Sequence, residues 1–140
     1  MCFVIAKRFT KVSPDQALLT GLLHVLGRLY IIMRSKDAPE LSDTALREII
    51  DGWHANIGKA ILETWGLPET LQGAVEHQDE FEIEFDGDIT LGDVLIAAKL
   101  VQRGEQDLKL YPSLRRVGIA PGDMDKHADE IKSVRSSLSE

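Results

Sequence analysis

The sequence predicts an all-α, single-domain protein of 140 residues. Helix-starting signals recur along the chain, and the apolar residues that follow them repeat every three or four positions, the spacing of one helix face. Only one short segment, residues 80–86, alternates apolar and acidic residues with the period of a strand. The length allows a buried core without disulfides or a structural metal.

The first strong helix signal is Ser13, followed by Pro14 and Gln16 in the order of a capping box. An apolar stripe behind it predicts a helix of roughly five turns that ends near Ser35. The stripe consists of Leu18, Leu19, Leu22, Leu23, Leu26, Leu29 and Met33. The apolar residues 1–5 at the start of the chain predict a helix docked on the core or on another chain.

Ser42 opens a second long helix, which is expected to continue to Trp65 with Gly52 as a candidate break. Trp53 and Trp65 lie on its apolar pattern and are expected in the core. Gly66 suits the position just after a helix.

Pro68 starts another predicted helix, which runs to about Gln78. Residues 79–89 then predict an acidic extended loop rather than a strand, because no second strand lies nearby to pair with it. The loop is expected to be pinned to the helices by Phe81, Ile83 and Phe85. Its six acids are Asp79, Glu80, Glu82, Glu84, Asp86 and Asp88.

Thr90 caps the next apolar stretch, residues 91–101. Pro112 and Pro121 each start a shorter helical piece. All predicted elements are therefore helical.

Composition restricts the classes of function. The 16 basic and 23 acidic residues give a net charge of −7, which argues against nucleic acid and anionic membranes as partners. The single cysteine, Cys2, allows neither an internal disulfide nor a cysteine-based zinc site, and this suits a reducing compartment. Apolar runs such as residues 29–33 are too short to span a bilayer. We therefore expect a cytoplasmic protein.

Three of the four histidines, His24, His54 and His77, have small residues three or four positions away on the same helix face. Such faces allow close helix crossings with the imidazoles turned inward. A metal or phosphate pocket built from three helices is one interpretation. The other is three half-buried histidines that bind backbone groups between closely packed helices.

Three segments resemble motifs of the HD superfamily, in the same order and at similar spacing. They read LLTGLLHVLGRL at residues 18–29, WHANIGKAIL with WGLP at residues 53–68, and AVEHQD at residues 74–79. The WGLP signature is similar to that of the HDOD branch, the HD-related output domain of bacterial signalling proteins. The resemblance covers about residues 1–103, and residues 104–140 carry no matched motif.

The centre of the motifs departs from the catalytic pattern of the superfamily. Val25 follows His24 where the metal-binding pair has aspartate, and Gln78 follows His77 where the HD-GYP branch has a second histidine. Hydrolytic metal pairs need carboxylate charge. Arg28 adds a cation that repels metal, and Asp51 is a candidate partner for Arg28 or for His54.

The resemblance thus implies a non-catalytic signal-transduction output or interaction domain without a cofactor, in which the metal site survives only as a vestige. The vestigial ligands are His24, His54 and His77, and the expected pocket or hydrogen-bond network consists of His24, Arg28, Asp51, His54, His77 and Gln78. Two alternatives stay open: a metal-dependent phosphohydrolase acting on a nucleotide or cyclic dinucleotide, and a module that senses a small anion or nucleotide.

The resemblance also implies partners. We expect protein partners in a signalling pathway, no nucleic acid and no membrane. HDOD domains have another helical bundle before the region that the motifs cover, so the chain is expected to correspond to the C-terminal, HD-like part of such a domain. The exposed surface that results predicts a homodimer or a missing N-terminal half.

Overall fold

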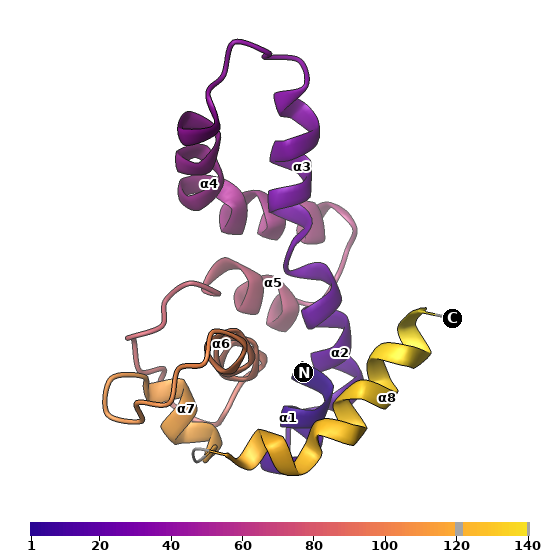
Figure 1. The fold of residues 1–140 in the computed structure, drawn as a ribbon, viewed down its shortest axis with the longest axis vertical. Helices are drawn as coiled ribbons and strands as arrows, with labels where there is room; N and C mark the ends of the chain where they lie inside the picture. Colours follow the sequence, from indigo (N-terminus) through magenta and orange to yellow (C-terminus); the bar gives the residue numbers. More distant parts are fainter. Residues whose placement is uncertain (120–121, 140) are drawn as a thin grey trace.

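The computed structural model describes residues 1–119 and 122–139, which form helices joined by turns and loops, with no strand among them (Figure 1). The predicted all-α fold is confirmed. In chain order the elements are α1 (Cys2–Phe9), α2 (Pro14–Leu23), α3 (Leu26–Ser35), α4 (Asp43–Thr64), α5 (Glu69–Glu76), α6 (Leu91–Gln102), α7 (Pro112–Val117), a short 3-10 helix η1 (Asp123–His127) and α8 (Ala128–Ser139).

The core is built around α6, which packs against α1, α2, α5 and α7. Every residue from Leu91 to Ala98 is buried, so this helix is covered on almost all sides. A helix that is apolar all round is stable in water only when other elements enclose it. The neighbouring helices turn their apolar stripes toward α6, and this burial is the main source of stability.

A buried carboxylate fixes the start of α6. Asp93 is 0% exposed and forms a capping box with Thr90, whose backbone N–H donates to its carboxylate over 3.1 Å. Ser113 and Arg116 of α7 also donate to Asp93, over 2.9 and 3.3 Å. A buried charge is tolerated when it is fully hydrogen-bonded, and this one ties α7 to α6.

The apolar start of the chain docks on the core, which is one of the two arrangements that the sequence predicts. Val4 and Ile5 of α1 are 0% exposed. On the outer side of α1, Lys7 and Arg8 donate to Glu130 of α8 over 3.3 and 2.9 Å. These surface ion pairs hold the C-terminal helix against α1.

The helix expected to run from Pro14 to near Ser35 is interrupted at His24 and Val25. His24 donates from its own Nδ1 to the Gly21 carbonyl oxygen over 2.6 Å. In an uninterrupted helix that oxygen would accept from the backbone of Val25. Competition between side chain and backbone for one acceptor accounts for the break.

The helices α3 and α4 form an antiparallel pair, which we call the arm, at one end of the molecule away from α6, α7 and α8 (Figure 1). Their crossing is unusually close at Gly27. A β-carbon added to Gly27 would lie 1.8 Å from the His54 carbonyl oxygen and 2.8 Å from the Gly58 nitrogen. Only glycine permits this approach.

The expectation that both tryptophans lie in the core is wrong: Trp53 is 59% exposed and Trp65 is 60% exposed. The buried stripe of α4 runs through Ile50, His54 and Leu62 instead. Trp53 immediately precedes His54 and therefore points about 100° away from the buried direction. The helix also passes Gly52 without the break considered for it.

The acidic segment between α5 and α6 is an irregular loop, as predicted. Phe81 and Phe85 pack against the core, whereas Ile83 is 50% exposed and does not pin the loop. The helical start predicted at Pro121 lies outside the described residues; η1 and α8 follow it in the chain.

Among the described residues, one segment passes a test of length and apolar composition for a membrane-spanning helix. This segment is Pro14–Ser35, and 22% of the window tested within it is buried. Mostly buried core helices and N-terminal signal sequences pass the same test, so it is weak evidence, and this segment is divided between α2 and α3.

Replacing Gly27 tests whether the arm depends on backbone contact. Gly27→Ala is expected to lower the free energy of unfolding by about 2 kcal/mol or more, since the methyl group meets backbone atoms that cannot rotate away. Gly52→Ala is the matched control, because its added carbon has no atom within 4 Å and alanine favours a helix by up to about 1 kcal/mol. Urea unfolding followed by circular dichroism measures both, and equal stability of the two variants would contradict the close crossing.

Candidate functional site

A polar pocket of about 520 Å³ opens where the break between α2 and α3 faces α4, α6 and the loop after α5. We call it the histidine pocket. It brings together five of the six residues expected to form a pocket or network. Its lining residues are His24, Val25, Arg28, Asp51, His54, Gln78, Asp79, Phe81, Lys99, Gln102 and Arg103.

His24 stands at the helix break and forms one wall of the pocket. Because the Gly21 carbonyl can only accept, Nδ1 of His24 carries the proton and Nε2 keeps its lone pair in the neutral ring. Burial lowers the pKa of His24 below its ordinary value of 6.5; the hydrogen bond to Gly21 opposes this, and electrostatic interactions with Lys99, His54 and Arg28 lower the pKa further. The ring is therefore held neutral near pH 7.

His54 comes from the buried stripe of α4 and is 6% exposed. Its Nε2 donates to Oδ2 of Asp79, which lies in the turn after α5. The other carboxylate oxygen, Oδ1, accepts from the Lys99 ammonium over 2.7 Å. One carboxylate thus joins the middle of α4 to α6.

Gln78 completes this set of contacts. Its Oε1 accepts from Lys99 over 2.8 Å, and its Nε2 donates to the backbone oxygens of Val75 and His24, over 3.0 and 3.2 Å. The His24 oxygen is free for this bond because the helix is broken there. We call His54, Asp79, Lys99 and Gln78 the polar network.

Charges in the polar network stabilise one another. Burial raises the pKa of Asp79, but hydrogen bonding and attraction from Lys99, and then from His54, outweigh burial and bring it below 3.8. Burial lowers the pKa of Lys99 from 10.5, and Asp79 opposes that change. Near pH 7 the pair is an ammonium on a carboxylate.

The mouth of the pocket is basic. Arg103 lies over the Phe81 ring, with its guanidinium carbon 4.5 Å from the ring centroid, and Lys99 lies 5.7 Å from the same centroid. Arg28 lines the pocket as well, and no ion pair holds it among the residues described. Arg28 and Arg103 thus bring two cations to a lining that also contains Asp51, whereas the charge of Lys99 is paired with Asp79.

His77 does not share this pocket, although the sequence predicts it there. It precedes Gln78 at the end of α5, so its side chain leaves the helix in a different direction. There its Nδ1 lies 2.6 Å from Glu80 Oε2 and its Nε2 lies 3.6 Å from Glu76 Oε2. The three histidines therefore do not converge.

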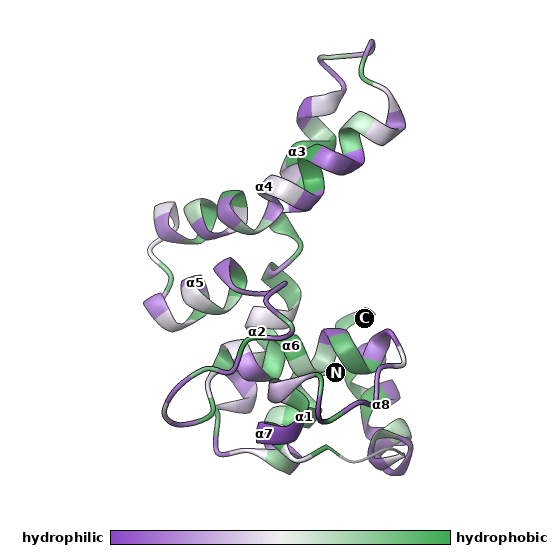
Figure 2. Cartoon of the chain, turned by 90° about the vertical axis from the view of Figure 1, so that its left-hand side faces the viewer, coloured by the Kyte–Doolittle hydropathy of each residue, from purple (hydrophilic) through white to green (hydrophobic). Residues whose placement is uncertain are grey.

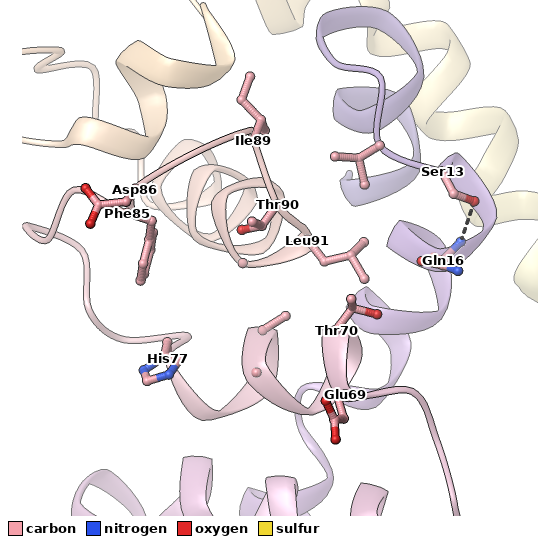
Figure 3. Close-up of a pocket in the computed structure, with 14 residues that line it drawn as sticks. Ser13, Gln16, Glu69, Thr70, His77, Phe85, Asp86, Ile89, Thr90 and Leu91 are labelled. Atoms are coloured by element: carbon pink, nitrogen blue, oxygen red, sulfur yellow. Dashed lines mark hydrogen bonds between the residues drawn. The ribbon is translucent and has the colours of Figure 1, made fainter.

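Instead, His77 lines a separate, mainly apolar cavity of about 600 Å³ between α5, the start of α2 and the loop before α6 (Figure 3). Figure 3 shows its ring on the same side of the cavity as Phe85, opposite Ser13 and Gln16. The ring centroids of His77 and Phe85 are 6.2 Å apart. We assign His77 to this wall.

The residues in the histidine pocket do not form a metal-binding set. Over residues 1–119 and 122–139, no group of three His, Cys, Asp or Glu side chains lies close enough to hold an ion. A metal bound by His54 and Asp79 would lie on the same carboxylate whose other oxygen, Oδ1, already accepts from the Lys99 ammonium. Two cations on one carboxylate repel each other strongly.

Sequence reasoning missed Asp79, Lys99, Phe81 and Arg103 as pocket residues. Lys99 did carry a signal, because it is a lone cation within the apolar stretch LGDVLIAAKLV. A lysine buried on such a helix usually has an acidic partner. Nothing local indicated that the partner would be Asp79.

A family model described as the HDOD domain matches residues 1–81, more than half of the chain. The matched part contains His24, His54 and Asp79, and it ends before Lys99. Searches of the curated proteins and of the solved structures found no significant match.

The neutral state of His24 predicts a pH dependence of stability. The pKa of His24 is lower in the folded chain than in the unfolded chain, so below pH 6.5 the unfolded chain binds more protons. The free energy of unfolding therefore decreases as the pH falls. His24→Asn retains a donor for Gly21 but does not titrate. Urea unfolding from about pH 8 to about pH 5 is expected to show a steeper loss in the wild type than in His24→Asn; parallel losses would contradict this role.

Proposed function

The chain belongs to the HDOD family, and from this premise we propose that it is a non-catalytic output domain of a signalling system that acts through contacts with other proteins. The observation that carries the proposal is the contact of Lys99 with Asp79 and Gln78, over 2.7 and 2.8 Å. An ammonium on this carboxylate supplies internally the positive charge that a metal would otherwise bring.

Physical chemistry supports this assignment. Metal-dependent hydrolysis requires an ion that binds and activates water. A network satisfied by its own lysine has no need of an ion, and the residue after His24 is Val25, which offers no oxygen ligand from its side chain. We infer that the polar network is structural: it fixes the middle of α4, the end of α5 and the last turn of α6 relative to one another.

A metal-binding comparison tests the role of the lysine. Wild-type protein dialysed against Mn²⁺ is expected to retain far less than one ion per chain, and to hydrolyse neither bis(p-nitrophenyl) phosphate nor a cyclic dinucleotide. Lys99→Met is expected to bind Mn²⁺ roughly tenfold more tightly, because a charge beside Asp79 is removed. Lys59→Met is the matched control, since Lys59 pairs with Glu76 at the surface, 3.2 Å away.

Two results of these experiments would contradict the proposal. One Mn²⁺ per wild-type chain, together with phosphodiester turnover that is lost in His24→Ala and His54→Ala, would establish the enzyme alternative. Unchanged affinity in Lys99→Met would show that the ammonium does not occupy a cation position.

The basic mouth of the pocket favours a second function, the sensing of a small anion or nucleotide. Arg28, Lys99 and Arg103 surround the same cavity, and Arg103 stacks on Phe81. Guanidinium groups suit phosphate oxygens, and an aromatic ring suits a base.

Pyrophosphate is a suitable probe of this second function. At 100 times its Kd it is expected to raise the melting temperature by roughly 4 °C or more through mass action. Arg28→Met should abolish the rise. Arg47→Met, which alters an exposed arginine of α4 outside the pocket, should retain it. No rise in the wild type, or an equal rise in both variants, would exclude an anion site in this pocket.

A further inference from the structure

The arm presents large apolar side chains to solvent. Met33 is 67% exposed, Trp53 is 59% exposed and Leu29 is 49% exposed, although α3 and α4 are packed against each other. Figure 2 shows hydrophobic residues along α3 and the start of α4, which project beyond the other helices, whereas the second half of α4 packs on α5. We define the arm face as Leu29, Tyr30, Ile32, Met33, Ile49 and Trp53, all at least 38% exposed.

Helical spacing arranges these residues in stripes. Leu29 and Met33 are four positions apart on α3, and Ile49 and Trp53 are four positions apart on α4, so each pair shares one side of its helix. The contact between the two helices uses other residues, among them Gly27 and His54. The residues of the arm face are therefore not the ones that hold α3 and α4 together. Large exposed apolar side chains gathered on one pair of helices indicate an interaction site.

Charges beside the arm face are arranged by helix. The helix α3 has two arginines and no acidic residue; Arg28 lines the histidine pocket, which leaves Arg34 beside the arm face. In the first half of α4, Asp51 also lines that pocket, which leaves two acids and one arginine: Asp43, Glu48 and Arg47. Arg34, Asp43 and Glu48 are exposed, and no ion pair neutralises them in the described parts of the chain. The two helices of the arm are therefore complementary in charge to each other.

We propose that the arm face binds a second copy of this chain, with α3 of each copy packed on α4 of the other about a two-fold axis. This arrangement places the basic helix of one copy over the acidic half-helix of the other, twice. A two-fold interface requires a surface that is complementary to itself, and the arm supplies both the apolar and the charged halves of one. The inference rests on the proposed function, since it names the protein partner.

The area is sufficient for a dimer. The exposed parts of the six side chains amount to on the order of 600 Å² for each copy, or about 1,200 Å² in total, the lower end of the range for specific interfaces. Two tryptophans and two tyrosines would lie within it. Aromatic residues contribute strongly to such interfaces.

A lipid surface is the main competing occupant of an apolar face. The acids Asp43 and Glu48 of α4 and the net charge of −7 oppose approach to an anionic bilayer. A different protein is the other competitor. Measurements on the purified chain separate both from a second copy.

Sedimentation equilibrium and light scattering of the wild-type chain are expected to give the mass of two 15.6 kDa chains. Met33→Lys and Trp53→Lys should each weaken association by roughly 30-fold or more, because every dimer carries the substitution twice at a buried apolar contact. Leu110→Lys is the matched control: Leu110 is 45% exposed but lies far along the chain from the arm, before α7. It should leave the dimer intact.

Hydrogen exchange gives a second readout that does not depend on any variant. Raising the protein concentration is expected to protect amides in α3 and the first half of α4, and not those of α7. A wild-type chain that stays monomeric at about 100 µM would overturn the proposal, because specific interfaces have Kd values from the micromolar range downward. A dimer that is unaffected by both arm variants would also overturn it.

Binding of the wild-type monomer to phosphatidylcholine–phosphatidylserine vesicles, with no dimer in solution, would assign the face to lipid instead. The non-catalytic role is judged separately by metal content and turnover. A failed dimer test therefore does not affect the conclusion on the non-catalytic role, and a failed test of the non-catalytic role does not affect the conclusion on the dimer.

Discussion

The close crossing of α3 and α4 at Gly27 is the constraint on which the rest of this structure depends. It brings the backbone of His54 against Gly27, and only the missing β-carbon allows this. The crossing fixes the rotation of α4, so the His54 imidazole turns toward Asp79 while Trp53 turns to solvent. A buried histidine, an exposed tryptophan and the direction of the arm thus share one steric cause. The glycine costs about 1 kcal/mol of helix propensity, and the contact that it permits offsets this.

The polar network shows how a site of this shape is stabilised by groups of the chain itself. Asp79 is 41% exposed at its side chain, whereas Lys99 is 15% exposed, so water screens one member of the pair more than the other. The Lys99–Asp79 pair therefore contributes less to stability than a fully buried pair would. Its contribution to specificity is geometric, because Asp79 and Gln78 both face Lys99 only when α5 ends at its observed position. The same cation also helps to keep His24 neutral.

Local rules predicted most of the fold. The hydroxyl groups of Ser13, Ser42 and Thr90 cap helices at the positions expected from the sequence, because capping depends on neighbours within four residues. The break at His24 was not predictable from periodicity, since it arises from one side chain that competes for one carbonyl oxygen. The pairing of Asp79 with Lys99, twenty residues away, depends on how two helices meet. The exposure of Trp53 was missed because an apolar stripe does not say which of its residues a neighbour will cover.

The hydrogen bond from Gln78 to the His24 oxygen connects the end of α5 to the break between α2 and α3, which is the joint where the arm begins. Tilting the arm about that joint would lengthen this bond, which contributes about 1 kcal/mol, and would move one wall of the histidine pocket at the same time. A ligand whose contacts with that wall change with the arm angle would therefore be thermodynamically linked to that angle. Any molecule that prefers one angle must, by reciprocity, be bound more tightly when another partner holds the arm at that angle.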